Sequence, residues 1–439
     1  MKKRIIFPLL TVLFTFLSCD KNDDDSSDTT NNSKLYPTTI QNNYPIILAH
    51  GFFGWGRDEM NGYHYWGGKG DTQEYLNQNG YKVFTASYGP ISSNWDRSVE
   101  LYYYIKGGTV DYGAVHAMRH GHNRYGETYT GAYPQWNETN KVHIIGHSMG
   151  GPTPRYLIEL LENGDPQEQA FVPSINEQPT SELFKGGKQW VHSLTTVAGV
   201  HNGALPADYI DFRENLSKMI LELGAIGGVV LEDNAVFDFD LGQWGLQRKE
   251  GESISDYFDR IFNKNNLKEG APADFWKSTD NGVYDLTVKA SQQQNASIKT
   301  SPNVYYASYA FDDTEQTGSD IHVPLSTMNP LVKVDAIGIG KTTDDLPFGY
   351  QAWRPCDGLV SIPSGNYPIG HKYAVMDPSK RVLQPKGVWD VHPNTKGQDH
   401  LSVIIPDNKQ SSIDMGNPNL FNLYAFYQQI AKDLSYLPK

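Results

Sequence analysis

The sequence predicts an α/β fold in which helices flank a central, mostly parallel sheet. Five β-branched or aromatic runs are almost continuously apolar, as strands buried on both faces of a sheet tend to be. Helical patterns lie between some of these runs, for example over 152–163, and the last helix is expected within 419–437. The five predicted strands are 45–50, 81–87, 141–146, 191–199 and 303–310.

The first 18 residues are predicted to be a signal peptide. Basic residues at 2–4 precede an apolar run over 5–17, and this order is typical of a secretory signal. The run is shorter than the roughly 20 residues that a membrane-spanning helix needs. Cys19 follows at the expected cleavage point and resembles the lipidated cysteine of a bacterial lipoprotein. The positions before it match that motif imperfectly, and a plain signal peptide is the alternative.

Residues 19–40 are predicted to form a disordered, acidic tether. The stretch "DKNDDDSSDTTNNS" after Cys19 contains no apolar residue, so it cannot bury enough surface to fold. Acidic residues directly after a lipidated cysteine resemble an export signal to the outer face of the outer membrane. We therefore expect an exported protein, either a surface lipoprotein held to the membrane through Cys19 or a secreted protein.

Residues 41–439 are predicted to form one domain with insertions near 88–140 and 205–300, because these intervals are too long for single crossovers. A content of 38% hydrophobic and 12% aromatic residues supplies a core. The net charge of −13, without a basic block, argues against a nucleic-acid partner. Cys356 is the only cysteine besides Cys19, so acylation of Cys19 leaves no intramolecular disulfide.

The predicted strand that ends at Gly146 runs into "GHSMG" and then a helix. This context is typical of a nucleophile elbow, in which a serine occupies a strained strand-to-helix turn that only small neighbours permit. An ordinary turn after a buried strand is the alternative. The helix that follows and the "HGF" segment after an earlier strand favour the elbow, so Ser148 is the predicted nucleophile.

Acyl transfer at a serine needs two N–H groups aimed at the oxygen that becomes negative. The residue after the nucleophile, Met149, is expected to supply one, and Phe52 in the "HGF" loop the other. Both donors belong to the main chain, so the side chains there can vary.

The serine also needs a histidine base and a carboxylate that orients it. The order nucleophile, acid, base along the chain favours Asp357 in "CDGLVS" and His400 in "GQDHLSVII". Spacing alone leaves other pairs open, drawn from His371, His392, Asp377 and Asp399.

Three stretches carry a resemblance to a known family: "ILAHGFFGWGRDEMNGYHYWGG", "GPISSNWDRSVELYYYIKGGTVDYGAVHAMRHGHNRYG" and "LGQWGLQRKEGES". They resemble the large zinc-containing bacterial triacylglycerol lipases of the bacillary and staphylococcal type, from about Tyr44 to the C-terminus. The resemblance implies an α/β-hydrolase fold that cleaves acylglycerols at a lipid–water interface. It also implies the triad Ser148, Asp357 and His400, with Phe52 and Met149 as oxyanion donors. Met149 stands where the family usually has glutamine.

The resemblance further implies a zinc site made by Asp96, His116, His122 and Asp280. Two imidazoles and two carboxylates fill a tetrahedral site completely, and such a closed site is structural. It would clip the 88–140 insertion to the segment near 280 and stabilise a domain that lacks disulfides. Without the resemblance, these histidines read as part of a polar loop.

A calcium site is also typical of the family, and Asp407 matches one of its ligands. Ser402 stands where the family has a glutamate, and Asn408 replaces a proline. Loss of a carboxylate ligand weakens the binding of a hard cation such as calcium.

Residues 214–233 form the most apolar segment after the signal peptide, with Leu216, Met219, Ile220 and Leu223 near one helical face. The resemblance implies that this segment is a helical lid, and a core helix is the alternative. Three functions remain: a lipase, a carboxylesterase or polyesterase with shorter or synthetic substrates, and a surface binding lipoprotein without chemistry. The complete triad disfavours the third.

Overall fold

The computed structural model describes residues 35–209, 237–262, 270–406 and 421–439. The predicted signal peptide, Cys19, the predicted lid segment 214–233 and Asp407 lie outside the described residues. Among the described residues, no helix is both long and apolar enough to cross a membrane.

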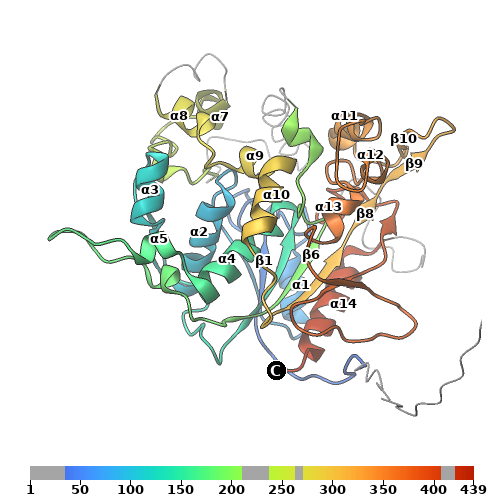
Figure 1. Ribbon diagram of the computed structural model, residues 1–439, viewed down its shortest axis with the longest axis horizontal. Helices are drawn as coiled ribbons and strands as arrows, with labels where there is room; N and C mark the ends of the chain where they lie inside the picture. Colours follow the sequence, from blue (N-terminus) through green and yellow to red (C-terminus); the bar gives the residue numbers. More distant parts are fainter. Residues whose placement is uncertain (1–34, 210–236, 263–269, 407–420) are drawn as a thin grey trace, which may run out of the picture. The chain divides into compact units, whose positions relative to one another are not determined.

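A seven-stranded sheet forms the centre of the domain, and each neighbouring pair of its strands is parallel. The predicted α/β architecture is therefore confirmed, and each of the five predicted runs contains a strand (Figure 1). Two further strands at one edge, β11 and β12, were not predicted. The order across the sheet is β11 (Tyr373–Val375), β12 (Trp389–Val391), β7 (Tyr305–Tyr309), β6 (Val191–Val197), β5 (Val142–His147), β1 (Ile46–Ala49) and β2 (Val83–Thr85).

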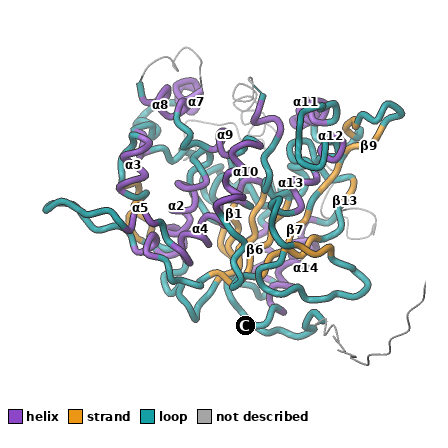
Figure 2. The backbone as a smooth tube through the Cα atoms, viewed as in Figure 1, coloured by secondary structure: helices purple, strands orange, loops and turns teal. Residues whose placement is uncertain are grey.

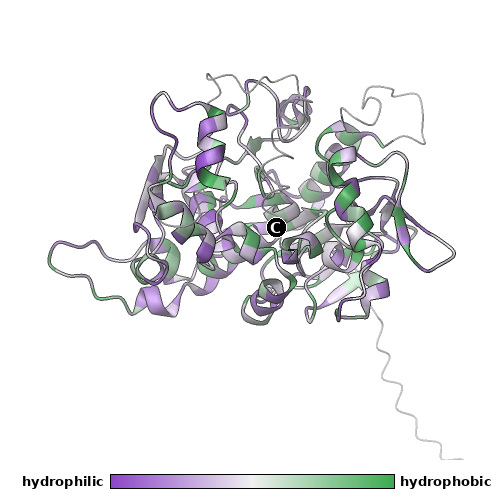
Figure 3. Cartoon of the chain, turned by 90° about the horizontal axis from the view of Figure 1, so that it is seen from above, coloured by the Kyte–Doolittle hydropathy of each residue, from purple (hydrophilic) through white to green (hydrophobic). Residues whose placement is uncertain are grey.

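Helices cover both faces of the sheet, because successive residues of each buried strand point to opposite sides. In β1, Ile46 and Leu48 join the core under α1 (Thr72–Gln78) and α14 (Leu423–Tyr436). Ile47 and Ala49 join the core under α2 (Asn94–Lys106) and α4 (Pro152–Asn163). Figure 3 shows that the helices of the protein carry both hydrophobic and hydrophilic residues. Burial of the apolar side of each helix thus fixes the layers above and below the sheet.

The two predicted insertions carry much of the structure outside this core (Figure 2). The first contains α2, an antiparallel pair and one short helix between its strands: β3 (Gly108–Asp111), α3 (Ala114–His120) and β4 (Tyr125–Tyr129). The second contains η3 (Leu205–Asp208), η4 (Gly242–Trp244), α7 (Ile254–Phe262), α8 (Ala271–Lys277), α9 (Gly282–Asp285) and α10 (Val288–Ser297). Between β5 and β6 lie η1 (Ser148–Gly150), α4, α5 (Pro166–Gln169) and η2 (Glu182–Lys185).

The chain also leaves the sheet between β7 and β11. This excursion contains β8 (Phe311–Asp312), β9 (Thr314–Gln316), β10 (His322–Pro324), α11 (Pro330–Ile339), α12 (Tyr350–Trp353) and α13 (Ile362–Asn366), and β13 (Thr395–Lys396) follows β12. The strand order reverses between β1 and β5, since β2 lies on one side of β1 and β5 on the other. In open parallel sheets, ligands bind beyond the carboxyl ends of the strands at such a reversal.

The packed domain begins upstream of the predicted boundary at residue 41. Leu35 forms a β-bridge with Val382, and the Tyr36 N–H donates to the Arg381 carbonyl. The Tyr36 hydroxyl donates to the Asp433 carbonyl at 3.1 Å. Residues 35–40, which the prediction assigned to the tether, therefore belong to the domain, because an aromatic side chain anchors them to α14.

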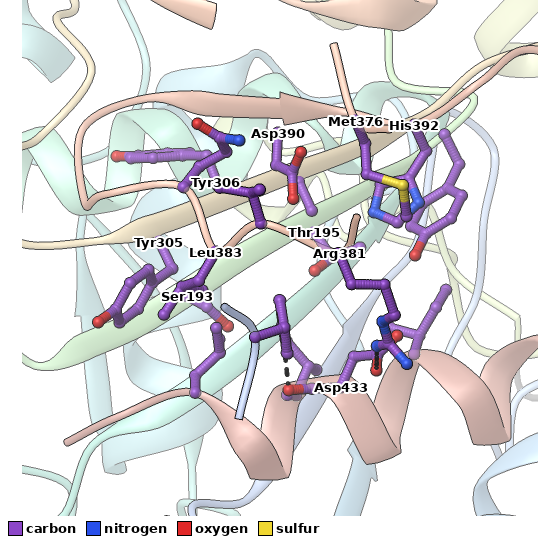
Figure 4. Close-up of a pocket in the computed structure, with 18 residues that line it drawn as sticks. Ser193, Thr195, Tyr305, Tyr306, Met376, Arg381, Leu383, Asp390, His392 and Asp433 are labelled. Atoms are coloured by element: carbon purple, nitrogen blue, oxygen red, sulfur yellow. Dashed lines mark hydrogen bonds and ion pairs between the residues drawn. The ribbon is translucent and has the colours of Figure 1, made fainter. Parts of the chain in front are cut away.

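A cavity of about 610 Å³ lies between the sheet and α14 (Figure 4). Arg381 and Asp433 form an ion pair in its wall, whereas the carboxylate oxygen Asp390 Oδ1 is buried without a hydrogen-bond partner among the described residues. Burial, reinforced by Asp433, raises the pKa of Asp390 to about 7. The cavity contains no serine paired with a histidine and a carboxylate in the manner of an acyl-transfer site, because its Ser193 hydroxyl bonds to the ring of His143 outside it.

We expect Asp390→Asn to stabilise the protein at alkaline pH. An aspartate titrates near 3.9 in an unfolded chain and Asp390 titrates near 7 in the folded one, so the folded state binds the proton more tightly. The contribution of Asp390 to the free energy of unfolding therefore falls as pH rises from about 4 to 7 and stays low above pH 7. Asparagine resembles the protonated carboxyl, so the melting temperature should rise by about 2 °C or more at pH 8 and stay unchanged near pH 4. Asp58→Asn, which alters an exposed carboxylate, is the control; an equal rise in both variants, or none in Asp390→Asn, contradicts the assignment.

Candidate functional site

Ser148 lies directly after β5 in a strained turn. Its φ of 56° is in the left-handed region, which side chains other than glycine rarely adopt. A β-carbon on Gly146 would lie 1.7 Å from the Gly150 carbonyl oxygen, and one on Gly150 would lie 2.1 Å from the Ala49 carbonyl oxygen. The two glycines of "GHSMG" are thus required by close backbone approach, and the turn has the local structure predicted for it.

His400 and Asp357 form a buried pair beside this turn. His400 Nδ1 lies 2.8 Å from Asp357 Oδ2, and the two residues are 3% and 1% exposed. The other carboxylate oxygen, Oδ1, accepts the N–H groups of Leu359 and Val360 at 3.0 and 2.7 Å. The backbone N–H of His400 also donates to the Asp357 carbonyl at 2.8 Å. The carboxylate is therefore fixed on one side and free to hold the imidazole on the other.

The alternative bases and acids lie elsewhere. His371 bonds to Thr300 and to the Asn295 carbonyl, and His392 stacks on Tyr309 in the cavity near α14. Asp377 is an exposed loop residue, whereas Asp399 accepts the N–H groups of Asn329, Leu401 and Ser402. Of these groups, the structure pairs His400 with Asp357, and the His400 carbonyl bonds to His147, the residue before Ser148.

A second, larger cavity of about 890 Å³ opens at this site, and both Ser148 and His400 line it. Its wall is almost entirely apolar or aromatic, with Asp335 as the one carboxylate in the described lining. Burial raises the pKa of Asp335 to about 6. The apolar members of the lining are Phe52, Phe53, Trp55, Val200, Ala204, Pro206, Leu286, Leu331, Leu359, Val360, Leu401, Ile404 and Ile405.

The loop after β1 is held from outside the cavity by a buried arginine. Arg97 of α2 donates from Nη2 to the carbonyls of His50 and Gly51 at 2.7 and 3.2 Å, and the Gly54 N–H donates to Gly51 as well. In a trans peptide the carbonyl and the following N–H point in opposite directions. The bonds to the Gly51 carbonyl therefore fix the direction of the Phe52 N–H, which donates to no acceptor among the described residues.

Asp96, His116, His122 and Asp280 form a buried cluster, and one ligand atom from each lies within 4.8 Å of the others. His116 Nε2 lies 3.2 Å from both Asp96 Oδ1 and Asp280 Oδ2, and His122 Nε2 lies 3.2 Å from Asp280 Oδ2. Asp96 Oδ1 and His122 Nε2 are nevertheless buried without a hydrogen bond to any residue that the structure describes. Such orphaned atoms carry a large desolvation cost that a cation removes, so these residues fit a metal site.

Several residues of both sites were missed by the sequence reasoning. Gln243 donates from Nε2 to Asp96 Oδ2 at 2.9 Å, and Trp95 stacks on the His116 ring. Tyr65 bonds to His147 next to the nucleophile. Each lies within a stretch that carried the family resemblance, and that location was the one available signal.

The calcium prediction is untested, because Asp407 and Asn408 lie outside the described residues. Ser402, the residue that replaces the family glutamate, is 5% exposed, and its hydroxyl bonds to Gln398 Oε1 and the Asp399 carbonyl.

Comparison with known proteins places this arrangement in a family. Residues 42–437 match the model of the lipase-like, C-terminal domain. The chain belongs to this family. Its identification confirms the resemblance to staphylococcal lipases: the chain is 38% identical to Lipase 1 of Staphylococcus aureus over 378 residues, which are 84% of this chain and 52% of that protein. It is 36% identical to a lipase of Staphylococcus epidermidis over 421 residues, 94% and 56% of the two chains. The chain thus spans about half the length of the curated relatives it matches.

Solved structures of this lipase-like family share the fold. EstA from Clostridium botulinum matches with a TM-score of 0.79 at 37% identity, over 91% of this chain and 89% of EstA. Lipase 1 from Pelosinus fermentans matches with a TM-score of 0.76 at 37% identity, over 91% and 100%. The Staphylococcus hyicus lipase matches with a TM-score of 0.71 at 36% identity, over 91% and 97%. The lipase-like domain therefore has the α/β-hydrolase fold.

Proposed function

We propose that this protein is an exported lipase, a serine hydrolase that cleaves the carboxylic esters of acylglycerols. The observation that carries the proposal is Ser148, held in a left-handed turn in the wall of an apolar cavity that is also lined by His400, whose ring bonds to the buried Asp357. Relatives that share most of this chain are named lipases, and EstA from Clostridium botulinum shares its fold.

In this mechanism Ser148 Oγ attacks the ester carbonyl, and its proton passes to His400 Nε2. Asp357 holds Nδ1–H, so it fixes the tautomer and stabilises the imidazolium. The N–H groups of Phe52 and Met149 stabilise the oxyanion. Collapse of the tetrahedral intermediate breaks the ester C–O bond, and the alcohol leaves with the proton from His400. Water, deprotonated by His400, then attacks the acyl-enzyme and releases the fatty acid and free Ser148.

An apolar surface beside the cavity supports a lipid substrate over a soluble ester. Leu331 of α11 lines the cavity, while Val334 and Ile337 of the same helix are 72% and 42% exposed. Exposed apolar residues that gather at the rim of a site are typical of surfaces that contact lipid or another protein. We infer that α11 meets the lipid–water interface, so that an acyl chain enters the cavity without crossing water.

We expect the wild-type protein to hydrolyse p-nitrophenyl esters up to C16 and emulsified triolein, and Ser148→Ala to lose at least about 10³-fold in kcat. Rates over the series C2 to C16 measure this. Ser193→Ala, a buried serine on the neighbouring strand, is the control and should keep its activity. Hydrolysis confined to C2–C4 would favour the alternative carboxylesterase or polyesterase. Full activity in Ser148→Ala would remove the mechanism, and an inactive wild type would favour a binding lipoprotein.

We also propose that the cluster of Asp96, His116, His122 and Asp280 holds zinc. Two imidazole nitrogens and two carboxylate oxygens are a complete tetrahedral set for this ion, which leaves no position for substrate. The ion would tie α2 and α3 of the first insertion to the segment after α8, and its role would be structural.

Elemental analysis is expected to find close to one zinc per chain. The double variant Asp96→Ala, His122→Ala should lose the ion and melt several degrees lower, because two buried ligands are left without a cation. His120→Ala is the matched control, since His120 adjoins the cluster and bonds to Ser278 instead. Unchanged zinc content and melting temperature in the double variant would contradict the site.

Membrane attachment through an acylated Cys19 is a further part of the proposal, supported by the signal-like residues 1–18 and the acidic stretch that follows. Labelled palmitate should enter the wild-type chain and Cys356→Ala, but not Cys19→Ser. Label retained in Cys19→Ser would refute the anchor and favour a secreted protein.

A further inference from the structure

A chain of hydrogen bonds joins the loop after β1 to the loop that carries His400. The Gly51 N–H donates to the Tyr65 hydroxyl at 2.9 Å, and that hydroxyl lies 2.6 Å from His147 Nδ1. His147 Nε2 lies 3.0 Å from the carbonyl oxygen of His400. Tyr65 and His147 are 5% and 1% exposed, so water does not compete for these bonds.

The direction of each proton in this chain is determined by its ends. The His400 carbonyl can only accept, so His147 Nε2 carries a hydrogen and donates it. Burial, reinforced by His400, lowers the pKa of His147 well below its ordinary value, so the ring is neutral and Nδ1 accepts. The Tyr65 hydroxyl therefore donates to Nδ1, and its oxygen accepts the Gly51 N–H. Each member has one bond on each side, and a chain satisfied in this way is rigid.

Tyr65 and Arg97 hold the peptide groups on the two sides of Gly51. Tyr65 fixes the N–H of Gly51, and Arg97 fixes its carbonyl. Gly51 itself has little room to move, because its surroundings are tightly packed. A β-carbon on Gly51 would lie 2.6 Å from Ser148 Cβ and 2.8 Å from the Tyr65 hydroxyl oxygen. The next N–H along the chain belongs to Phe52, the proposed oxyanion donor.

We propose that Tyr65 is a positioning residue, which acts through His147 to hold the oxyanion loop and the His400 loop in one fixed relation. This inference rests on the proposed function, because it assigns the chain a role in the chemistry of Ser148. Tyr65 itself exchanges no proton with substrate. It sets the distance between the group that stabilises negative charge and the base that accepts the proton, and a misplacement of about 1 Å in such a site can cost about 100-fold in rate.

Tyr65→Phe removes the hydroxyl and keeps the ring that packs against Trp55 and Trp66. We expect kcat to fall about 10- to 100-fold with KM within about twofold of the wild-type value, because the loss affects the transition state. The affinity for an alkyl boronic acid, which forms a tetrahedral adduct with the serine, should fall in parallel with kcat/KM. Tyr104→Phe is the matched control: it removes a hydroxyl that donates to the Thr85 carbonyl at 2.7 Å on α2, away from the loop, and should keep kcat.

A double-mutant cycle tests the connection itself. If Tyr65 acts through His147, then Tyr65→Phe combined with His147→Phe should lose no more than about threefold beyond the more damaging single change. If the losses in kcat of the two single variants multiply in the double variant, the proposed hydrogen-bond connection is wrong. It is also wrong if a folded Tyr65→Phe keeps the wild-type kcat and boronate affinity. His147→Phe gives the same single-variant readout if Tyr65→Phe is not recovered folded. An active Ser148→Ala would instead refute the proposed function, so the two failures are distinguishable.

Discussion

The turn that carries Ser148 depends on the absence of three β-carbons. Gly146, Gly150 and Gly51 lie where the turn at Ser148 meets the end of β1. A β-carbon on Gly146 or Gly150 would collide with a backbone carbonyl, and one on Gly51 would collide with Ser148 Cβ and the Tyr65 hydroxyl. This contact lets the serine turn and the loop after β1 rest directly on each other. The left-handed conformation of Ser148 is unfavourable on its own, and the surrounding sheet over-determines it. Ser148 and the loop after β1, the proposed nucleophile and oxyanion loop, therefore have a fixed separation.

Two consecutive residues of α2, in the first insertion, also help to hold the loop after β1 in place. Arg97 bonds to the carbonyls of His50 and Gly51, and Asp96 belongs to the cluster that we propose to hold zinc. Helical geometry turns these neighbouring side chains about 100° apart, so one helix contacts the oxyanion loop and the cluster at once. An ion bound to Asp96 thus constrains the helix that supplies Arg97. The insertion is part of the support of the site, although it lies outside the central sheet.

The sequence allowed the fold and much of the site to be predicted, because both depend on local patterns. Buried parallel strands appear as apolar runs, and the elbow appears as two glycines around a serine. Strands β11 and β12 were not predicted from the sequence, because each has three residues and Asp390 interrupts the apolar pattern of β12. The order of residues along the chain favoured His400, and the resemblance supported its choice over His371 and His392, because spacing alone left all three histidines open. The bond between Tyr65 and His147 joins residues 82 positions apart, and no local pattern records such a contact.

The way in which the chain enters the domain also has a consequence. Leu35 and Tyr36 attach to residues 381–382 and to α14, and the Asn42 side chain bonds to the carbonyls of Leu434 and Leu437 and to the ring of His143 near the start of β5. The strands of a parallel sheet all run in the same direction. This entry point therefore lies at the amino-terminal ends of the strands, whereas Ser148 follows the carboxyl-terminal end of β5. If the protein is attached to a membrane through its first residues, Ser148 would therefore lie on the side of the domain opposite the attachment.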